Sequence, residues 1–191
     1  MRKIELERRQ RFDALFASYR SDIVAYCGWR AGSASDAQDA VAEVFLTAWR
    51  RLDQLPAGDA ARVWLYATAR RVIANQRRSS RRRAALHERL ALETPFAQQE
   101  PAVLDPEENL VHETLRRIGA RDREILLLAE WEGLSAAQIG VVLGCLAVTA
   151  RGRLHRARQR FRSAFEALAA REGEEPKHSP QVFAKEDHAH V

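Results

Sequence analysis

Apolar residues recur with helical spacing in two stretches of the chain, residues 8–83 and 109–171. The clearest case is the segment 33–52, whose apolar side chains share one face of a helix turning about 100° per residue. That face consists of Ala37, Val41, Val44, Phe45, Ala48 and Leu52. Ser35 followed by Gln38 has the spacing of a capping box, which predicts the start of this helix. Long alternating runs of β-branched residues are absent from the sequence, so the pattern predicts an all-α protein.

The side of the 33–52 helix opposite its apolar face carries the acidic residues Asp36, Asp39 and Glu43. Asp36 and Asp39 fall in the first turn, where the helix dipole favours negative charge. An acidic stripe of this kind is either a solvated face or a docking surface for a partner, and the spacing alone leaves both interpretations open.

The segment 62–83 places apolar residues directly beside arginines. One predicted helical face, expected to be core, holds Leu65, Ala69 and Val72. One flanking face holds Trp64, Thr68, Arg71 and Asn75. The other flanking face holds Tyr66, Arg70, Ile73 and Arg77. Aromatic rings beside guanidinium groups can bind single-stranded nucleic acid, because bases stack on the rings and phosphates pair with the cations. The alternative is that Trp64 and Tyr66 simply pack between helices.

The second stretch predicts three helices in a helix-turn-helix layout. The first ends near Gly133, Ser135 caps the second, Gly144 ends it, and the third covers about residues 147–168. The predicted core face of the third helix is Leu154, Ala157, Phe161, Phe165 and Leu168. Its polar side carries two sets of arginines. The first set is Arg153, Arg156 and Arg160, and the second is Arg151, Arg158 and Arg162.

The remaining segments lack helical periodicity. Residues 84–108 contain three prolines and mostly acidic charges, which predicts a flexible linker. Residues 172–191 read as a disordered tail, in which we expect solvated histidines rather than a zinc site. The fold class that we expect is therefore all-α, with two small helical domains, 8–83 and 109–171, joined by a flexible linker.

Charge points to a polyanionic partner. The formal net charge is +5, and all but three of the 31 basic residues are Arg. Seven arginines lie between positions 70 and 83 without an acid among them. A GC-rich genome also raises the Arg content of a protein, but it does not explain clustering. Nucleic acid or an acidic membrane surface would attract such a chain.

Other features exclude several function classes. Cys27 and Cys145 match no metal or redox spacing, which favours a reduced, cytoplasmic setting. The N-terminus has no secretion signal, and no window of about 18 uninterrupted apolar residues predicts membrane insertion. We find no metal-ligand set, no phosphate-binding Gly loop and no nucleophile–base pair, so we expect neither an enzyme nor a cofactor.

Taken together, the two stretches resemble a bacterial sigma factor of the extracytoplasmic-function group. "DAQDAVAEVFLTAWRRL", "WLYATARR" and the Arg run are similar to that family's domain 2. "RDREILLLAEWEGLSAAQIGVVLGC" with "TARGRLHRAR" is similar to its domain 4. The resemblance implies a subunit that guides core RNA polymerase to promoters and helps to open them. Its implied partners are core RNA polymerase, promoter DNA and an anti-sigma factor.

The resemblance also implies three sets of site residues. The set expected to dock on core polymerase is Asp36, Asp39, Glu43, Leu46 and Trp49. The set expected at the −10 element, beside a base-trapping loop at 53–62, is Trp64, Arg70, Arg71, Asn75, Arg77 and Arg78. The set expected at the −35 element is Arg151, Arg153, His155 and Arg156.

The chain departs from the family pattern at three positions. Arg71 stands where the family usually has Asn, and Leu146 and Gly152 stand where it often has Ser. Losing a Ser cap at Leu146 should cost about 1 kcal/mol of helix stability. Two other functions remain open at this point: a stand-alone helix-turn-helix regulator that dimerises through residues 10–83, and an RNA-associated helical scaffold.

Overall fold

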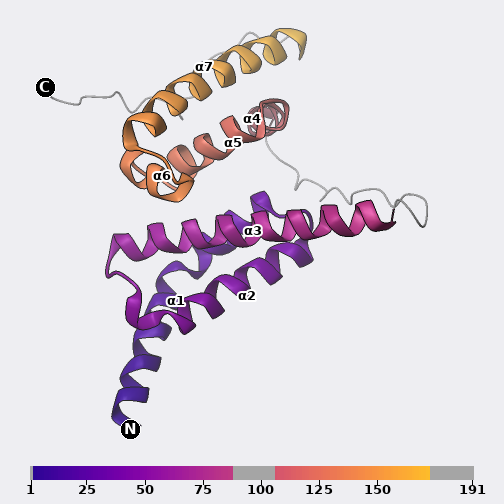
Figure 1. Cartoon of the computed structure of the whole chain (residues 1–191). Helices are drawn as coiled ribbons and strands as arrows, with labels where there is room; N and C mark the ends of the chain where they lie inside the picture. Colours follow the sequence, from indigo (N-terminus) through magenta and orange to yellow (C-terminus); the bar gives the residue numbers. More distant parts are fainter. Residues whose placement is uncertain (1, 88–105, 173–191) are drawn as a thin grey trace, which may run out of the picture. The chain divides into compact units, whose positions relative to one another are not determined.

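The computed structural model describes residues 2–87 and 106–172, and within these residues all regular elements are helices (Figure 1). The chain divides into two compact units, Met1–Glu100 and Pro101–Val191, which we call unit 1 and unit 2. The all-α class with two helical domains is confirmed. The linker predicted at 84–108 is shorter at both ends, because residues 84–87 continue α3 and residues 106–108 begin α4. The remainder of the predicted linker, 88–105, and the predicted tail after residue 172 lie outside the described residues.

Unit 1 packs three helices together (Figure 1): α1 (Arg2–Arg30), α2 (Ala34–Arg50) and α3 (Asp59–His87). A 3-10 turn, η1 (Leu52–Gln54), follows α2. Each helix contributes fully buried side chains to the core, among them Ile23, Tyr26, Ala40, Val44, Ala48, Leu65, Tyr66 and Ala69. Removal of this apolar surface from water stabilises the unit.

The start of α2 differs from the prediction. Ser33, not Ser35, is the N-cap, and its backbone is extended with φ −153° and ψ 166°. The Ser33 hydroxyl accepts the backbone N–H of Asp36 at 3.1 Å and donates to the Asp36 carboxylate at 2.9 Å. Ser33 thus makes one hydrogen bond with the backbone of Asp36 and one with its side chain, and α2 begins earlier than the Ser35–Gln38 spacing predicted.

The predicted core face of α3 is too narrow. Leu65 and Ala69 are buried as expected, but Val72 is only half-buried. Tyr66, for which the sequence left both nucleic-acid binding and packing between helices open, is fully buried, with its ring centroid 5.2 Å from that of Tyr26. A helix that contacts both α1 and α2 buries a wider arc than an amphipathic surface helix, and Tyr66 and Ile73 therefore join the core.

Within its described residues, 106–172, unit 2 contains four α-helices and one π-helical turn. The α-helices are α4 (Pro106–Arg117), α5 (Ala120–Leu126), α6 (Ala136–Leu143) and α7 (Ala147–Glu172). The first predicted helix is in fact α5 followed by the π-helical turn η2 (Leu127–Trp131), and α4 precedes it as a helix that was not predicted separately. The long helix α7 packs against α4, α5 and α6 and buries Leu154, Ala157, Phe161, Phe165 and Leu168, its predicted core face.

The helix-turn-helix corner between α6 and α7 follows the prediction closely. Ser135 and Gln138 form a complete capping box, and Gly144 ends α6 with φ +69°, a left-handed conformation that favours glycine. Gly140 is required for another reason: a Cβ there would lie 2.7 Å from the carbonyl oxygen of Cys145. The close approach of α6 to the turn fixes the position of α7.

Among the described residues, no single helix is long and apolar enough to cross a membrane; α6 and α7 meet the length and composition test only together, across a bend of 100°.

Candidate nucleic-acid and polymerase interfaces

The arginines of α7 separate into two groups in the structure. Arg158 donates from Nε and Nη2 to the Glu130 carboxylate at 3.0 and 2.9 Å, and the Glu130 side chain is only 9% exposed. Arg160 donates from Nη1 to both carboxylate oxygens of Asp122, at 3.0 and 2.8 Å. These two cations tie α7 to η2 and α5. Arg158 is largely shielded from water, whereas the Arg160 side chain is 60% exposed and pairs with Asp122 at the surface.

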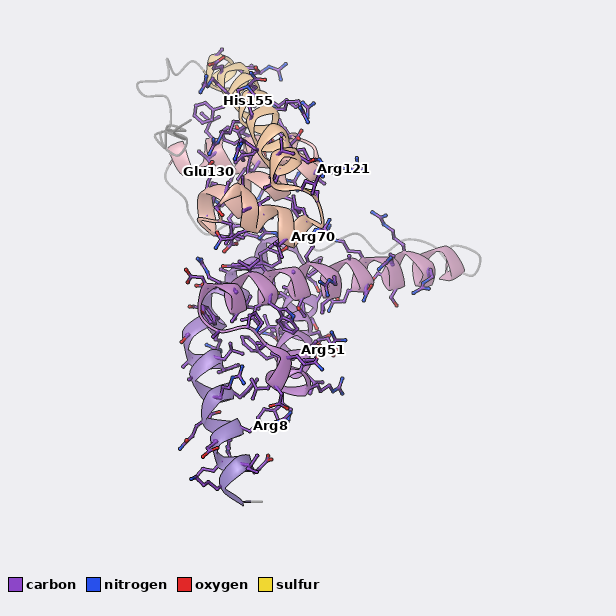
Figure 2. The ribbon with its side chains drawn as sticks, turned by 60° about the vertical axis from the view of Figure 1, so that its left-hand side comes forward. Arg8, Arg51, Arg70, Arg121, Glu130 and His155 are labelled. Carbon is purple, nitrogen blue, oxygen red and sulfur yellow. The ribbon has the colours of Figure 1, made fainter. Side chains whose placement is uncertain are left out.

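The arginines nearer the start of α7 are free to meet a ligand. Arg151, Arg153 and Arg156 are exposed, and no ion pair is recorded for them within the described residues. His155, labelled in Figure 2, lies between them and shares a 3.1 Å hydrogen bond with Gln159. The four predicted −35 residues therefore lie together on the exposed N-terminal half of α7. The arginines that follow them, Arg158 and Arg160, are paired with Glu130 and Asp122.

Exposed apolar side chains also lie near the α6–α7 turn, and the sequence analysis did not predict their exposure. Leu146 and Val148, at the start of α7, are 73% and 67% exposed. Val141 on α6 is 64% exposed. The signal that would have found Val148 is its helical position, because it lies four residues before Gly152 and seven before His155, on the side opposite the core face.

On α3, one row of the predicted −10 residues is exposed. Arg71, Asn75 and Arg78 follow one another at helical spacing, and Arg78 Nη2 donates to Asn75 Oδ1 at 2.5 Å. Trp64 begins the same row and is half-buried. This row presents two guanidinium groups and an amide to the solvent.

The other predicted −10 residues are partly engaged within unit 1. Arg77 donates to the backbone carbonyl oxygen of Arg30, which ends α1, and thereby satisfies a terminal helix acceptor. Arg70 is half-buried (labelled in Figure 2). The structure therefore does not bring all six residues onto one open face.

On α2, the predicted docking residues also divide. Asp39, Glu43 and Leu46 are exposed at positions i, i+4 and i+7, and Leu46 is 42% exposed. Asp36 is half-buried and occupied by the Ser33 cap. Trp49 packs against α1, with its ring 5.2 Å from the Phe12 ring and 5.1 Å from the Arg8 guanidinium carbon.

Arg62 links α3 to α1 in a polar cluster that the sequence did not reveal. Its Nε donates to the Asp22 carboxylate at 3.1 Å, and its Nη2 donates to the Tyr66 hydroxyl at 3.3 Å. Burial lowers the pKa of the Arg62 guanidinium, but Tyr66 and Asp22 together raise that pKa above its ordinary value. Arg62 is therefore a permanent cation, and its ion pair is a fixed part of unit 1.

In the part of the chain that the structure describes, no group of three or more His, Cys, Asp or Glu side chains could bind a metal ion. The two cysteines form no disulfide with each other, and Cys27 is buried while Cys145 is half-buried. The described surfaces are cationic helical faces and one acidic face, which suit macromolecular partners.

Two family models match the chain: Sigma-70 region 2 over residues 15–83, and Sigma-70, region 4 over residues 108–161. The ECF RNA polymerase sigma factor SigL of Mycobacterium tuberculosis is 32% identical over 162 residues, which cover 81% of this chain and 89% of SigL. This chain belongs to the ECF sigma factors of RNA polymerase. It is a promoter-specific transcription initiation factor rather than an enzyme, and the expected function is confirmed.

Other relatives agree with this membership. The RNA polymerase sigma-H factor of Pseudomonas aeruginosa is 29% identical over 171 residues, 84% of this chain and 89% of the relative. The sigma factor RpoE from Bartonella quintana, solved in complex with the anti-sigma factor NepR, has the same fold, with a TM-score of 0.59 and 21% identity over 87% of this chain and 98% of that chain. Membership of this family excludes the two other functions that the sequence left open, a stand-alone regulator and an RNA-associated scaffold.

Proposed function

We propose that this sigma factor reads the −35 element of its promoters with the N-terminal half of α7. The observation that carries this proposal is the division of the α7 arginines: acids hold Arg158 and Arg160, whereas Arg151, Arg153 and Arg156 are exposed without a recorded ion pair among the described residues. In a helix-turn-helix, the start of the second helix enters the major groove. This is where the exposed arginines lie.

The exposed arginines can contact either bases or phosphates of the DNA. A guanidinium that reaches O6 and N7 of a guanine contributes about 1–3 kcal/mol of discrimination against other bases. Arginines that reach phosphates instead fix the register of α7 on the duplex. His155 lies within this set and contributes a further donor or acceptor to the groove.

We assign the −10 element to unit 1. An extruded base of the non-template strand enters the loop at 53–62, and flipping it costs a few kcal/mol that pocket and phosphate contacts offset. Arg71, Asn75 and Arg78 track the strand along the exposed row of α3, while Trp64 supports the loop. Arg70 and Arg77 contribute positive charge from the adjoining side of the helix, where Arg77 also holds the end of α1.

We assign core polymerase docking to α2. Asp39 and Glu43 supply negative charge and Leu46 supplies apolar surface, all three exposed on one side of the helix. Asp36 and Trp49 support this surface from its edges, through the Ser33 cap and the packing against Phe12. Complementary charge would speed the association and orient it.

Three further proposals concern context. The functional domains are residues 8–83 and 109–171, joined by a linker at 84–108 and followed by a tail at 172–191. An anti-sigma factor binds the protein, as NepR binds the sigma factor RpoE in the solved complex from Bartonella quintana. The protein acts in the cytoplasm, because its template and polymerase are there.

Selection of promoters by reconstituted holoenzyme tests the −35 assignment. Full-length protein is mixed with core polymerase and a pool of genomic fragments, and the bound promoters are sequenced. Arg153→Ala and Arg156→Ala should each relax the base preference at the −35 element and leave the −10 preference in place. Arg162→Ala, an exposed arginine farther along α7, is the matched control and should leave both preferences unchanged. An unchanged −35 motif with both α7 variants would overturn the assignment.

A further inference from the structure

Val148 is an apolar side chain in an otherwise cationic surface. It is the second residue of α7 and is 67% exposed. Gly152 and His155 follow it at i+4 and i+7, so all three lie along the side of α7 that faces away from the buried Leu154 and Phe161. Single exposed apolar side chains are common on protein surfaces, but within a proposed DNA-binding face this valine offers apolar surface that a base in the major groove can contact.

Gly152 has no structural explanation within unit 2. A Cβ at this position would meet only the Arg156 Nη1 atom, at an ordinary contact distance of 3.7 Å. The residue has no positive φ, and it lies inside a helix, where glycine is less favourable than alanine. What glycine does provide is bare backbone beside the Val148 isopropyl group, so that a ligand can approach α7 more closely there than at its neighbours.

We propose that Val148 and Gly152 receive the C5 methyl group of a thymine in the −35 element, an inference that rests on the function proposed for α7. The thymine methyl is the apolar group that the major groove offers, and apolar side chains recognise it by contact. Arg151, Arg153 and Arg156 surround the two residues with positive charge, which complements the phosphates on both sides of the groove and disfavours a cationic partner. The pair therefore adds a preference for thymine to the guanine contacts of the arginines.

Replacement of thymine by deoxyuridine tests the proposed contact by removing a single methyl group. After promoter selection with wild-type holoenzyme, each thymine of the selected −35 element is replaced in turn by deoxyuridine, which pairs identically but lacks the methyl. Binding should weaken about fourfold at one position, the effect of losing one buried methyl group. With Val148→Ala holoenzyme the same replacement should have little further effect. Val141→Ala removes the same atoms from an equally exposed valine on α6 and should leave the fourfold sensitivity intact.

Gly152→Ala tests whether DNA approaches α7 closely at this position, because the substitution should raise the stability of the protein and lower its affinity for the promoter. The variant should unfold at a temperature a few degrees higher, since alanine favours the helix. It should bind the same promoter several-fold more weakly, because the new methyl group occupies the space of the thymine methyl. Gly28→Ala on α1, where a Cβ would meet nothing within 4 Å, should raise the unfolding temperature without weakening promoter binding.

The outcomes separate this inference from the proposed function. If Arg153→Ala and Arg156→Ala relax the −35 preference but every deoxyuridine is tolerated, the thymine contact is wrong and the −35 assignment stands. A selected −35 element without a thymine preference, or a Gly152→Ala variant with unchanged promoter binding, also overturns it. If the arginine variants leave the −35 motif intact, the proposed function itself fails.

Discussion

Arg158 on α7 and Glu130 on η2 form a double hydrogen-bonded ion pair between residues 28 positions apart in the sequence. The Glu130 side chain is 9% exposed and that of Arg158 25% exposed, so the pair is largely shielded from water. A pair in this environment fixes α7 against the preceding segment. It also removes Arg158 from the set of cations available to DNA.

Arg158→Ala should destabilise the protein by about 2–3 kcal/mol, because it leaves the Glu130 carboxylate buried without its cation. Urea unfolding of the full chain, followed by circular dichroism, measures this loss. Arg162→Ala, at an exposed position of the same helix, should change the unfolding free energy by about 0.5 kcal/mol or less. Equal stability of the two variants would show that the ion pair is not important for the fold.

Gly140→Ala should disrupt the helix-turn-helix corner. The new Cβ would lie 2.7 Å from the Cys145 carbonyl oxygen, which is backbone and cannot rotate away. Overpacking of this kind costs about 1–3 kcal/mol, and the displacement of α7 should also weaken binding to the −35 element. The measurements are thermal unfolding and promoter binding by holoenzyme. Gly28→Ala is the control, and a Gly140→Ala protein as stable as that control would contradict the close approach.

Leu46→Ala should weaken binding to core polymerase about tenfold, because an interface would bury this leucine, which is 42% exposed in the free protein. Its unfolding temperature should barely change. The affinity is measured by titrating labelled full-length protein with core polymerase. Val24→Ala, at a 43% exposed position on α1, should keep wild-type affinity. Equal losses from both substitutions would argue against α2 as the docking surface.

Arg71→Ala and Arg77→Ala should differ in a way that follows from their contacts. Removing a phosphate contact to a single strand lowers the slope of log K against log salt by about 0.7, and Arg71→Ala should do this without loss of stability. Arg77→Ala should also lower the unfolding temperature, because it removes the donor to the Arg30 carbonyl. Salt titrations of promoter binding and thermal unfolding provide the two readouts. A salt slope unaffected by Arg71→Ala would remove this residue from the −10 interface.

Features that depend on neighbouring residues were predictable from the sequence. The Ser135 cap and the end of α6 at Gly144 follow from local hydrogen bonding and backbone conformation, and both were located correctly. The apolar face of α7 also followed from its spacing, because a helix repeats at about 100° per residue, and all its predicted core side chains are buried.

Features that depend on distant partners were not predictable. Asp122 lies 38 residues before Arg160, and nothing in the local pattern separates Arg160 from the exposed Arg156. For Tyr66 the local pattern left two interpretations open, and only its partner Tyr26, which comes from another helix, decides for packing between helices. The Ser33 cap was missed because two serines compete at the start of α2, and the side-chain geometry of Asp36 decides between them.

Some α7 arginines form internal ion pairs and others face the solvent, and this separation affects how promoter recognition can change in evolution. The cations that secure the helix are separate from those that face outward, so a substitution at Arg153 or Arg156 leaves the internal pairs with Glu130 and Asp122 in place. A lineage can therefore alter which promoters it recognises by single replacements at the outward positions, without first acquiring compensating mutations that keep unit 2 folded.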